Sequence, residues 1–368
     1  MTLLAGIVVG LWTRQRKMGD QWIFGELGQE HKEFAGMKSA HLGEMRKAGI
    51  RVPPGFALSL KSYEKFMRET GAVEEIHRYL STLTADPNKH DHLMRYQEAS
   101  EVIRSIVESK RMPEDLETAI KRHYDDLCQK TGVPNVLVAT RSSGPASHPG
   151  QYETYLYISG VSEVFKNIIK VWSSTFNQRS LIARARKGLP LEFDPIGVCV
   201  LKMVNAKAAG VMFTLNPVNG DHAKIAVGGN WGLGEAVVSG EVTNDQWLID
   251  KVTLEIVNRT IASKTKEYIF DPEQKVVLYK EIGAERRTNP CLNDEELSEL
   301  ARQAKRIEEH FGVPQDIEWA LDKDLPFPQN VLFVQARPET IWSKKQARSV
   351  LETKKQFGEY DIFSLVRK

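Results

Sequence analysis

Residues 316–340 read DIEWALDKDLPFPQNVLFVQARPET, and this segment indicates the fold more clearly than any other part of the chain. Two β-rich runs, 316–321 and 331–336, flank a polar stretch that contains two prolines. Runs of this kind predict a pair of antiparallel strands joined by a long loop. We therefore expect a long-looped β-hairpin in this part of the chain.

Three polar side chains on this hairpin are candidates for chemistry. Gln335 and Arg337 are two residues apart, so they face the same side of their strand, and pairing across the hairpin can place Glu318 beside Gln335. Carboxylate and amide oxygens suit Mg²⁺, and a neighbouring arginine suits the phosphates that usually accompany this metal. The alternative is a surface ion pair between Glu318 and Arg337, which needs no ligand.

The composition is that of an ordinary folded protein. The chain of 368 residues is long enough for about two domains. Its residues are 41% hydrophobic and 27% charged, and this composition excludes disordered and collagen-like proteins. With 50 Lys+Arg against 48 Asp+Glu, the net charge of +2 indicates neither a nucleic-acid nor a membrane partner. The 3 cysteines form neither a disulfide framework nor a CxxC metal site, which favours a reducing, cytoplasmic location.

Both ends of the chain differ from the rest. Residues 3–12 are apolar, but this run is only about half as long as the ~20 residues that a membrane helix needs. Basic residues follow the run, whereas in a signal peptide they precede it. We expect residues 1–18 to be an extension outside the fold and residues 343–368 to be a C-terminal tail.

Helical and β patterns both occur between these ends, which predicts an α+β protein. The expected elements are a helix over 38–48, helices over 61–130, strands over 135–140 and 155–158, a helix over 164–187, β-rich runs over 196–204, 209–215, 223–228 and 246–257, and a helix capped by Asn293. In this last helix Glu296 stands three residues after the cap, as in a capping box, and an apolar face is expected along Leu297, Leu300, Ala301, Ala304 and Ile307.

Three further segments are candidates for phosphate binding. The loop 142–150 between two expected strands offers backbone N–H groups and hydroxyls, with Arg141 at its start. Residues 231–235 form a glycine-rich turn through which backbone can approach a ligand. Lys38 stands at an expected helix start. Taken singly, each has an ordinary alternative: a hairpin loop, a β-turn and a solvated lysine.

Several short blocks follow one another along the chain in a distinctive order. They are GMKSAHLGEM (36–45) with VPPGF (52–56), VATRSS (138–143), GQYETYL (150–156), GVMFT (210–214), WGLGE (231–235), DIEWA (316–320) and VQARPET (334–340). Their order resembles the N-terminal ATP-grasp region of the phosphoenolpyruvate synthase and pyruvate phosphate dikinase family. The resemblance implies an ATP-grasp fold of two lobes with the nucleotide bound between them: an N-terminal lobe with a helical insertion over 19–195 and a C-terminal lobe over 196–342.

The same resemblance implies roles for individual residues. The catalytic residues are Lys38, Arg141 and Arg337, of which Lys38 and Arg141 contact the ATP phosphates and Arg337 stabilises the transferring phosphoryl group. Gly150 and Thr154 lie on the phosphate loop, and Glu318 and Gln335 hold the nucleotide and Mg²⁺, or Mn²⁺ in its place. The segment 200–204 resembles the strand whose backbone pairs with adenine, which implicates Lys202 and Met203. The loop 143–150 is shorter than in most synthase-like relatives, so their lid behaviour is not carried over.

One family feature is missing from the sequence. Relatives pass phosphate through a histidine in a Gly-Gly-x-x-Ser/Thr/Cys-His-Ala setting on a swivelling domain, and none of the 9 histidines here has that setting. We therefore expect the histidine and the acceptor site on a partner subunit, as in the divided phenylphosphate synthase. There the β-phosphoryl of ATP would reach the partner histidine, with AMP and phosphate released, and phenol would be phosphorylated. The alternatives are a self-contained ATP-grasp kinase, a nucleotide-binding regulatory module, and the ATP-binding part of a phosphoenolpyruvate synthase or antibiotic phosphotransferase.

Overall fold

The structure is a computed structural model. It describes residues 21–23, 26–145, 152–271, 273–274 and 276–342. The expected extension over 1–18, the expected tail over 343–368 and the candidate Gly150 lie outside the described residues. Helices and strands both occur in quantity, which confirms the α+β class.

The chain divides into two compact units. Unit 1 takes the residues up to Glu44 together with Pro54–Met203, and unit 2 takes Met45–Pro53 together with the residues from Val204 on. The chain therefore passes from one unit to the other three times.

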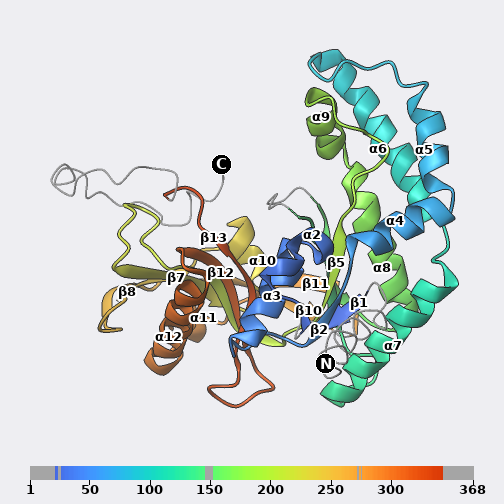
Figure 1. The fold of residues 1–368 in the computed structure, drawn as a ribbon. Coiled ribbons are helices and arrows are strands. Elements are labelled where there is room, and N and C mark those ends of the chain that lie inside the picture. Colours follow the sequence, from blue (N-terminus) through green and yellow to red (C-terminus); the bar gives the residue numbers. More distant parts are fainter. Residues whose placement is uncertain (1–20, 24–25, 146–151, 272, 275, 343–368) are drawn as a thin grey trace, which may run out of the picture. The chain divides into compact units, whose positions relative to one another are not determined.

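Unit 1 is built on a five-stranded antiparallel sheet (Figure 1). Its strands are β1 (Gln21–Ile23), β2 (Gly55–Leu58), β3 (Val138–Ser143), β4 (Thr154–Ile158) and β5 (Gly197–Lys202), in the spatial order β1-β2-β5-β3-β4. β2 directly follows two prolines, and its residues Phe56, Ala57 and Leu58 are all buried.

The position of β5 differs from the expected lobe boundary at residue 196. β5 pairs with β2 through Gly55↔Leu201 and with β3 through Ala139↔Leu201. Both edges of β5 are therefore hydrogen-bonded within unit 1, and the division between the units follows it, after Met203. The run 196–204 resembles the later β-rich runs in sequence, so local pattern gives no sign of which sheet it joins.

Helices supply most of the remaining mass of unit 1 (Figure 1). They are α2 (Lys32–Ala35), α3 (Met37–Lys47, which continues into unit 2), α4 (Leu60–Glu69), α5 (Ala72–Leu80), α6 (Leu93–Glu108), α7 (Glu114–Thr131), α8 (Val161–Ser173) and α9 (Gln178–Arg186). Tyr63 and Phe66 of α4 lie in the core, where both rings pack against Trp172 of α8. All three side chains are fully buried.

The single helix expected over 164–187 is two helices, α8 and α9. The Ser174 hydroxyl donates back to the Val171 carbonyl and the Thr175 hydroxyl to that of Trp172, and such local bonds compete with helix continuation. Asn177 then caps α9, because its side-chain oxygen accepts the Ser180 N–H at 2.9 Å. Hydrophobic periodicity continues through this break, so periodicity alone did not reveal it.

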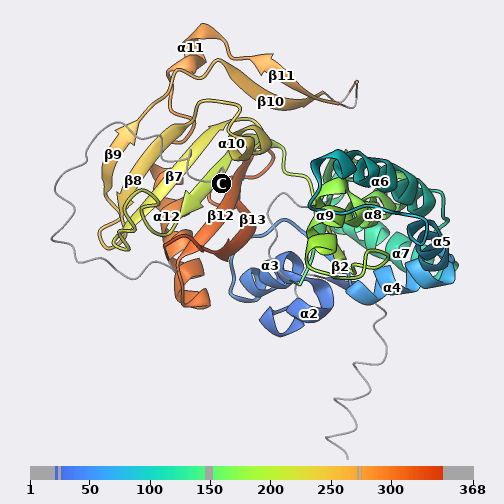
Figure 2. The ribbon, with the colours of Figure 1, turned by 90° about the horizontal axis from the view of Figure 1, so that it is seen from above.

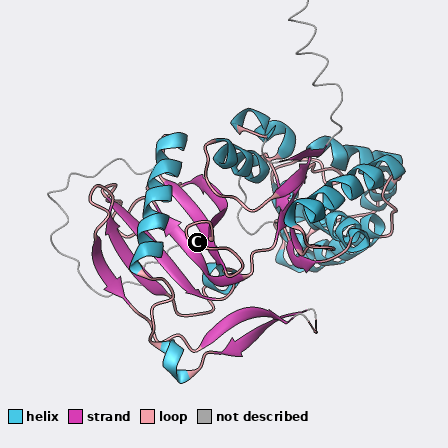
Figure 3. Cartoon of the chain, turned by 90° about the horizontal axis from the view of Figure 1, so that it is seen from below, coloured by secondary structure: helices cyan, strands magenta, loops and turns pink. Residues whose placement is uncertain are grey.

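Unit 2 is built on a six-stranded antiparallel sheet (Figure 3). Its strands are β6 (Ala206–Phe213), β7 (Lys224–Trp231), β8 (Asp245–Asp250), β9 (Ile256–Thr260), β12 (Gln315–Asp322) and β13 (Val331–Pro338), in the spatial order β13-β12-β6-β7-β8-β9. The expected hairpin is confirmed as β12 and β13. α10 (Glu235–Ser239) is a short helix that follows β7.

The longest helix of unit 2, α12 (Asp294–Phe311), packs on β12 and β13. Its expected capping box is present: the Asn293 oxygen accepts the Glu296 N–H at 2.8 Å, and the Glu296 carboxylate accepts the Asn293 N–H at 2.9 Å. Its expected apolar positions, including Leu297, Leu300 and Ile307, are buried.

A separate two-stranded ribbon in unit 2 has no counterpart in the sequence analysis (Figure 2). It consists of β10 (Lys266–Asp271) and β11 (Val276–Glu281), and α11 (Ala284–Arg287) follows it. Asp245 holds both ends of this segment, because its carboxylate accepts from Nζ of Lys264 at 2.6 Å and from the N–H of Cys291 at 2.8 Å. Asp245 and Lys264 are completely buried.

Each helix in the described part of the chain is too short or too polar to cross a membrane.

Candidate functional site

The start of α3 and the end of β3 are joined in unit 1, although they lie about a hundred residues apart in sequence. The N–H of Ser39 donates to Oγ of Ser143 at 3.1 Å, and the Ser39 hydroxyl lies 3.0 Å from the same atom. The N–H of Met37 donates to the Gly144 carbonyl at 2.8 Å. These contacts place Lys38 next to the point where β3 enters the candidate phosphate loop.

Gly36 makes this approach of the two segments feasible. Its φ is +79°, and a Cβ built on it would lie 1.8 Å from the Ser143 carbonyl oxygen. Any larger residue would push α3 and β3 apart. Glycine at this position is therefore explained by the close approach of two backbones.

Lys38 and Arg141 lie near the same buried thiol. Cys199 of β5 is the cross-strand partner of Arg141 and is fully buried. Burial raises the pKa of this thiol to about 11, while the positive charges of Arg141 and Lys38 act in the opposite direction. The structure thus brings the two expected phosphate-binding cations into one region of unit 1.

Thr154 lies opposite Arg141. The two residues are register partners in the β3–β4 pair, and the side chain of Thr154 is exposed. The other expected member of the phosphate loop, Gly150, lies outside the described residues.

Lys202 and Met203 stand at the end of β5. The N–H of Lys202 donates to the Pro54 carbonyl at 2.9 Å, and the N–H of Met203 donates to the Leu137 carbonyl at 2.8 Å. Both N–H groups are thus used within unit 1. A backbone contact from these residues to adenine would involve their carbonyl oxygens.

The expected hairpin site of unit 2 has the predicted register. Glu318 pairs with Gln335, and the amide Nε2 of Gln335 donates to Oε1 of Glu318 at 2.9 Å. Next to this pair, Asp316 is the partner of Arg337, whose Nε and Nη2 donate to Oδ2 of Asp316 at 2.8 Å and 2.6 Å. We call these four residues the hairpin cluster.

Asp316 is the member of the hairpin cluster that the sequence analysis missed. Its carboxylate fixes the guanidinium of Arg337 through two hydrogen bonds to one oxygen. Burial raises the pKa of the Asp316 carboxyl above its ordinary value, and the charge of Arg337 opposes this effect. A signal was present in the sequence. In an antiparallel hairpin that pairs Glu318 with Gln335, the residue two positions before Glu318 must face the residue two positions after Gln335, and these residues are Asp316 and Arg337.

The donor set of the hairpin cluster fits Mg²⁺. It offers carboxylate oxygens and one amide oxygen, which are hard ligands, and Mg²⁺ in nucleotide sites usually takes one or two carboxylates together with waters and phosphates. Among the described residues no group of three or more His, Cys, Asp and Glu side chains is arranged to hold a metal by itself.

The glycine-rich turn over 231–235 serves packing within unit 2. Gly232 has a φ of +74°, and a Cβ on it would lie 2.2 Å from the Tyr268 carbonyl oxygen. The next N–H, that of Leu233, donates to the same carbonyl at 2.9 Å. The turn thus approaches the backbone of β10, which supports the structural alternative for this motif.

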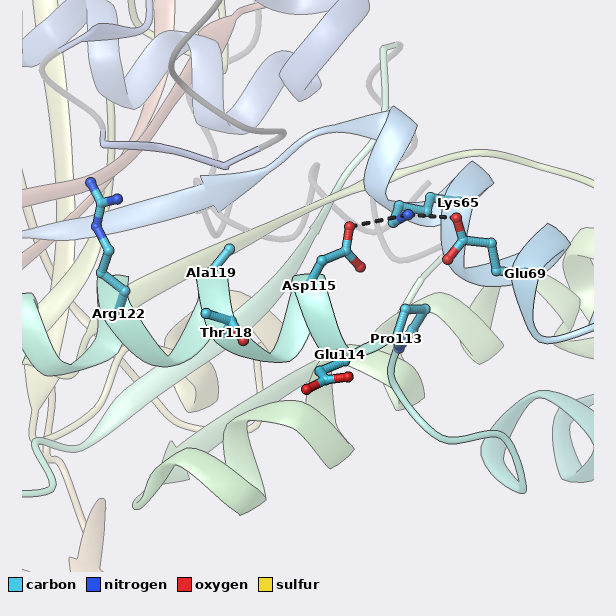
Figure 4. A pocket seen from close by; sticks show the side chains of 8 residues that line it. All are labelled: Lys65, Glu69, Pro113, Glu114, Asp115, Thr118, Ala119 and Arg122. Carbon is cyan, nitrogen blue, oxygen red and sulfur yellow. Dashed lines mark hydrogen bonds and ion pairs between the residues drawn. The ribbon is translucent and has the colours of Figure 1, made fainter.

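A surface pocket of unit 1 lies between α4 and α7, and none of the residues proposed for the site is among those that line it (Figure 4). Within it the ammonium group of Lys65 is paired with the carboxylates of Glu69 and Asp115. Because the Lys65 ammonium is already paired with two carboxylates and no residue proposed for the site lines this pocket, we assign no ligand to it.

Comparison with known proteins identifies the family of the chain. The sequence pattern of the family described as the pyruvate phosphate dikinase AMP/ATP-binding domain matches residues 32–357. A probable phosphoenolpyruvate synthase of Staphylothermus marinus is 38% identical over 367 residues, covering 92% of this chain and 43% of the relative. A probable phosphoenolpyruvate synthase of Methanocaldococcus jannaschii is 40% identical over 327 residues, covering 87% of this chain and 26% of the relative.

A third relative, the phosphoenolpyruvate synthase of Aeropyrum pernix, is 38% identical over 350 residues, covering 87% of this chain and 42% of the relative. The chain thus spans less than half the length of each of these relatives. The matched range covers the positions of Lys38, Arg141 and the hairpin cluster. This match confirms the resemblance found in the sequence, and the chain belongs to the family of the pyruvate phosphate dikinase AMP/ATP-binding domain.

Proposed function

We propose that this chain binds Mg·ATP and supplies the phosphoryl group for a phosphotransferase of the phosphoenolpyruvate synthase type. The observation that carries the proposal is the hairpin cluster, in which two cross-strand pairs put carboxylates, an amide and a guanidinium side by side. Phosphoryl transfer requires mainly positioning and neutralisation of charge, and this set of groups supplies both.

Each unit contributes one group of residues to nucleotide binding. In unit 1, Lys38, Arg141, Gly150 and Thr154 contact the phosphates, and the carbonyl groups of Lys202 and Met203 accept from the adenine amino group. In unit 2, Glu318 and Gln335 hold Mg²⁺, which neutralises phosphate charge when bound. Arg337, kept in orientation by Asp316, donates to the phosphoryl group in transfer.

The acceptor of the phosphoryl group is a histidine outside this sequence. The family's phosphohistidine setting does not occur among its 9 histidines. We therefore propose that the β-phosphoryl of ATP passes to a histidine on a partner subunit with release of AMP and phosphate, and that phenol is the final acceptor, as in the divided phenylphosphate synthase.

A second candidate is the ATP-binding part of a phosphoenolpyruvate synthase, whose final acceptor would be pyruvate. The names of the similar proteins favour it, since three of them are phosphoenolpyruvate synthases or probable ones at 38–40% identity. Both candidates use the same nucleotide chemistry and differ in the molecule that receives the phosphate.

Radiolabelled ATP separates these possibilities. The 368-residue chain is incubated with Mg²⁺ and ATP labelled in separate reactions at the β or the γ position, first with phenol or pyruvate alone and then with a histidine-bearing partner protein added. We expect slow hydrolysis at most from the chain alone, and the β label on the partner together with AMP after its addition. Label on phenol or pyruvate without a partner would contradict the relay and establish a self-contained kinase.

A further inference from the structure

The ion pair between Arg104 and Glu153 joins the helical part of unit 1 to the strand that carries Thr154. Nη1 and Nη2 of Arg104, on α6, donate to the two carboxylate oxygens of Glu153 at 2.7 Å and 2.9 Å. This is the two-pronged geometry in which arginine binds a carboxylate most strongly. The side chains are 28% and 35% exposed, so the pair is partly shielded from water.

Other contacts hold the same short segment. The Tyr155 hydroxyl donates to the Glu153 carboxylate, and the N–H of Glu153 donates to Oγ of Ser174 at 3.2 Å. One residue earlier, the Tyr152 hydroxyl donates to Asp194 at 2.8 Å. The residues immediately before Thr154 are therefore fixed to helices and loops outside the sheet.

β4 needs such support because its own pairing is weak. It is the edge strand of its sheet and pairs only with β3. The register between the two strands shifts between Val138 and Thr140, and Tyr157 has a φ of +58°, which is unfavourable for a bulky residue. An edge strand has ladder hydrogen bonds on one side only, and an irregularity in the register leaves the ladder locally incomplete.

We propose that Arg104 and Glu153 are positioning residues for phosphate binding: their ion pair fixes the register of β4 and so keeps Thr154 opposite Arg141. The inference rests on the proposed function, in which Thr154 and Arg141 contact the ATP phosphates. It assigns a role in nucleotide binding to the helical insertion, whose residues do not themselves touch the nucleotide in this scheme.

The test compares affinities for Mg·ATP and for adenosine, which lacks phosphates, together with the melting temperature. Arg104→Met should weaken ATP binding about tenfold, as expected for the loss of a charged hydrogen-bonded pair, and leave adenosine binding unchanged. Arg104→Lys should recover part of the ATP affinity, because lysine keeps the charge and loses the fork. Glu153→Met should weaken ATP binding at least as much as Arg104→Met, because it also removes the acceptor of the Tyr155 hydroxyl, and the double variant should show no loss beyond that of Glu153→Met.

Lys110→Met is the matched control. Lys110 follows α6 and pairs with Glu75, with side-chain exposures of 21% and 45%, so a similar ion pair is lost without any contact to β4. We expect a comparable change in melting temperature and no change in ATP affinity.

The possible failures are distinguishable. Unchanged ATP affinity in a folded Arg104→Met variant, or parallel losses of ATP and adenosine affinity in step with melting temperature, would overturn the positioning role alone. If Arg104→Met does not fold, Arg104→Lys with full ATP affinity and an intact melting temperature would overturn it as well. A wild-type chain that does not bind Mg·ATP would overturn the proposed function, and the inference with it.

Discussion

Gly36 stands where a side chain would collide with the backbone of β3. A Cβ there would lie 1.8 Å from the Ser143 carbonyl oxygen, so we expect Gly36→Ala to lower the free energy of unfolding strongly. Gly132→Ala is the control, because Gly132 has a similar φ of +68° and no atom within 4 Å of the added Cβ. The control should show only the cost of left-handed backbone, about 1–2 kcal/mol. Urea denaturation measures the free energy of unfolding of both variants. Equal losses in Gly36→Ala and Gly132→Ala would show that the close approach to Ser143 does not require glycine at position 36.

Phosphoryl transfer at the hairpin cluster is expected to need a positive charge of fixed orientation at position 337, which arginine provides. Its planar guanidinium donates twice to Asp316 and keeps a fixed orientation, whereas a lysine would carry the charge without the fork. We expect Arg337→Lys to slow phosphoryl transfer by roughly 10²–10³ while the dissociation constant for Mg·ATP changes little. AMP release is measured at saturating ATP with the histidine-bearing partner protein present, and a variant as fast as the wild type would refute this role.

The sequence predicted part of this cluster and missed part. Alternation along a strand and the hairpin pattern were enough to place Glu318 beside Gln335, because strand periodicity is a local property. Asp316 was overlooked although the same register places it opposite Arg337. The joining of Lys38 to the end of β3 depends on contacts between Ser39 and Ser143, and a single sequence contains no local pattern for a contact of that range.

The β10–β11 ribbon depends on a fully buried ion pair at its base. Asp245 accepts from the Lys264 ammonium and from two backbone N–H groups, and both charged side chains are completely buried. Removing one partner leaves the other charge unpaired in the core, which typically costs about 3–5 kcal/mol. We therefore expect Lys264→Met to destabilise unit 2 by an amount of that order, measured by chemical denaturation.

A matched control for this prediction is Lys121→Met. Lys121 pairs with Asp125 on the surface of α7, where both side chains are more than half exposed. Exposed pairs contribute little, so this variant should be almost as stable as the wild type. Equal stabilities of Lys264→Met and Lys121→Met would show that the buried pair does not stabilise the ribbon's attachment.

Elements with strong local signals were the ones predicted correctly. The capping box of α12 and the apolar face of that helix follow directly from residue spacing. The break between α8 and α9 was missed because it arises from serine and threonine hydroxyls that bond to the preceding carbonyls. The β10–β11 ribbon was missed because an isolated ribbon carries no clear alternation between buried and exposed faces.

For the whole molecule, the sequence indicated two lobes with a boundary between residues 195 and 196. The structure has the division after Met203, so β5 belongs to the first unit and not to the second. Strand pairing decides this point: β5 lies between β2 and β3, and residues 45–53 belong to unit 2 although unit 1 surrounds them in sequence. Long-range pairing of this kind depends on the complete fold. The order of short blocks along the chain was sufficient to identify the family, because it reflects the entire domain.

Calorimetric titration of the 368-residue chain with ATP, with and without Mg²⁺, tests whether this protein is a nucleotide-binding domain of the dikinase family. We expect one ATP to bind per chain, with an affinity that depends on Mg²⁺. Glu318→Gln keeps the shape of the side chain and removes an anionic ligand, so it should abolish most of this dependence on Mg²⁺. A wild-type chain that does not bind ATP, or one whose ATP affinity is the same with and without Mg²⁺ and in Glu318→Gln, would contradict the account.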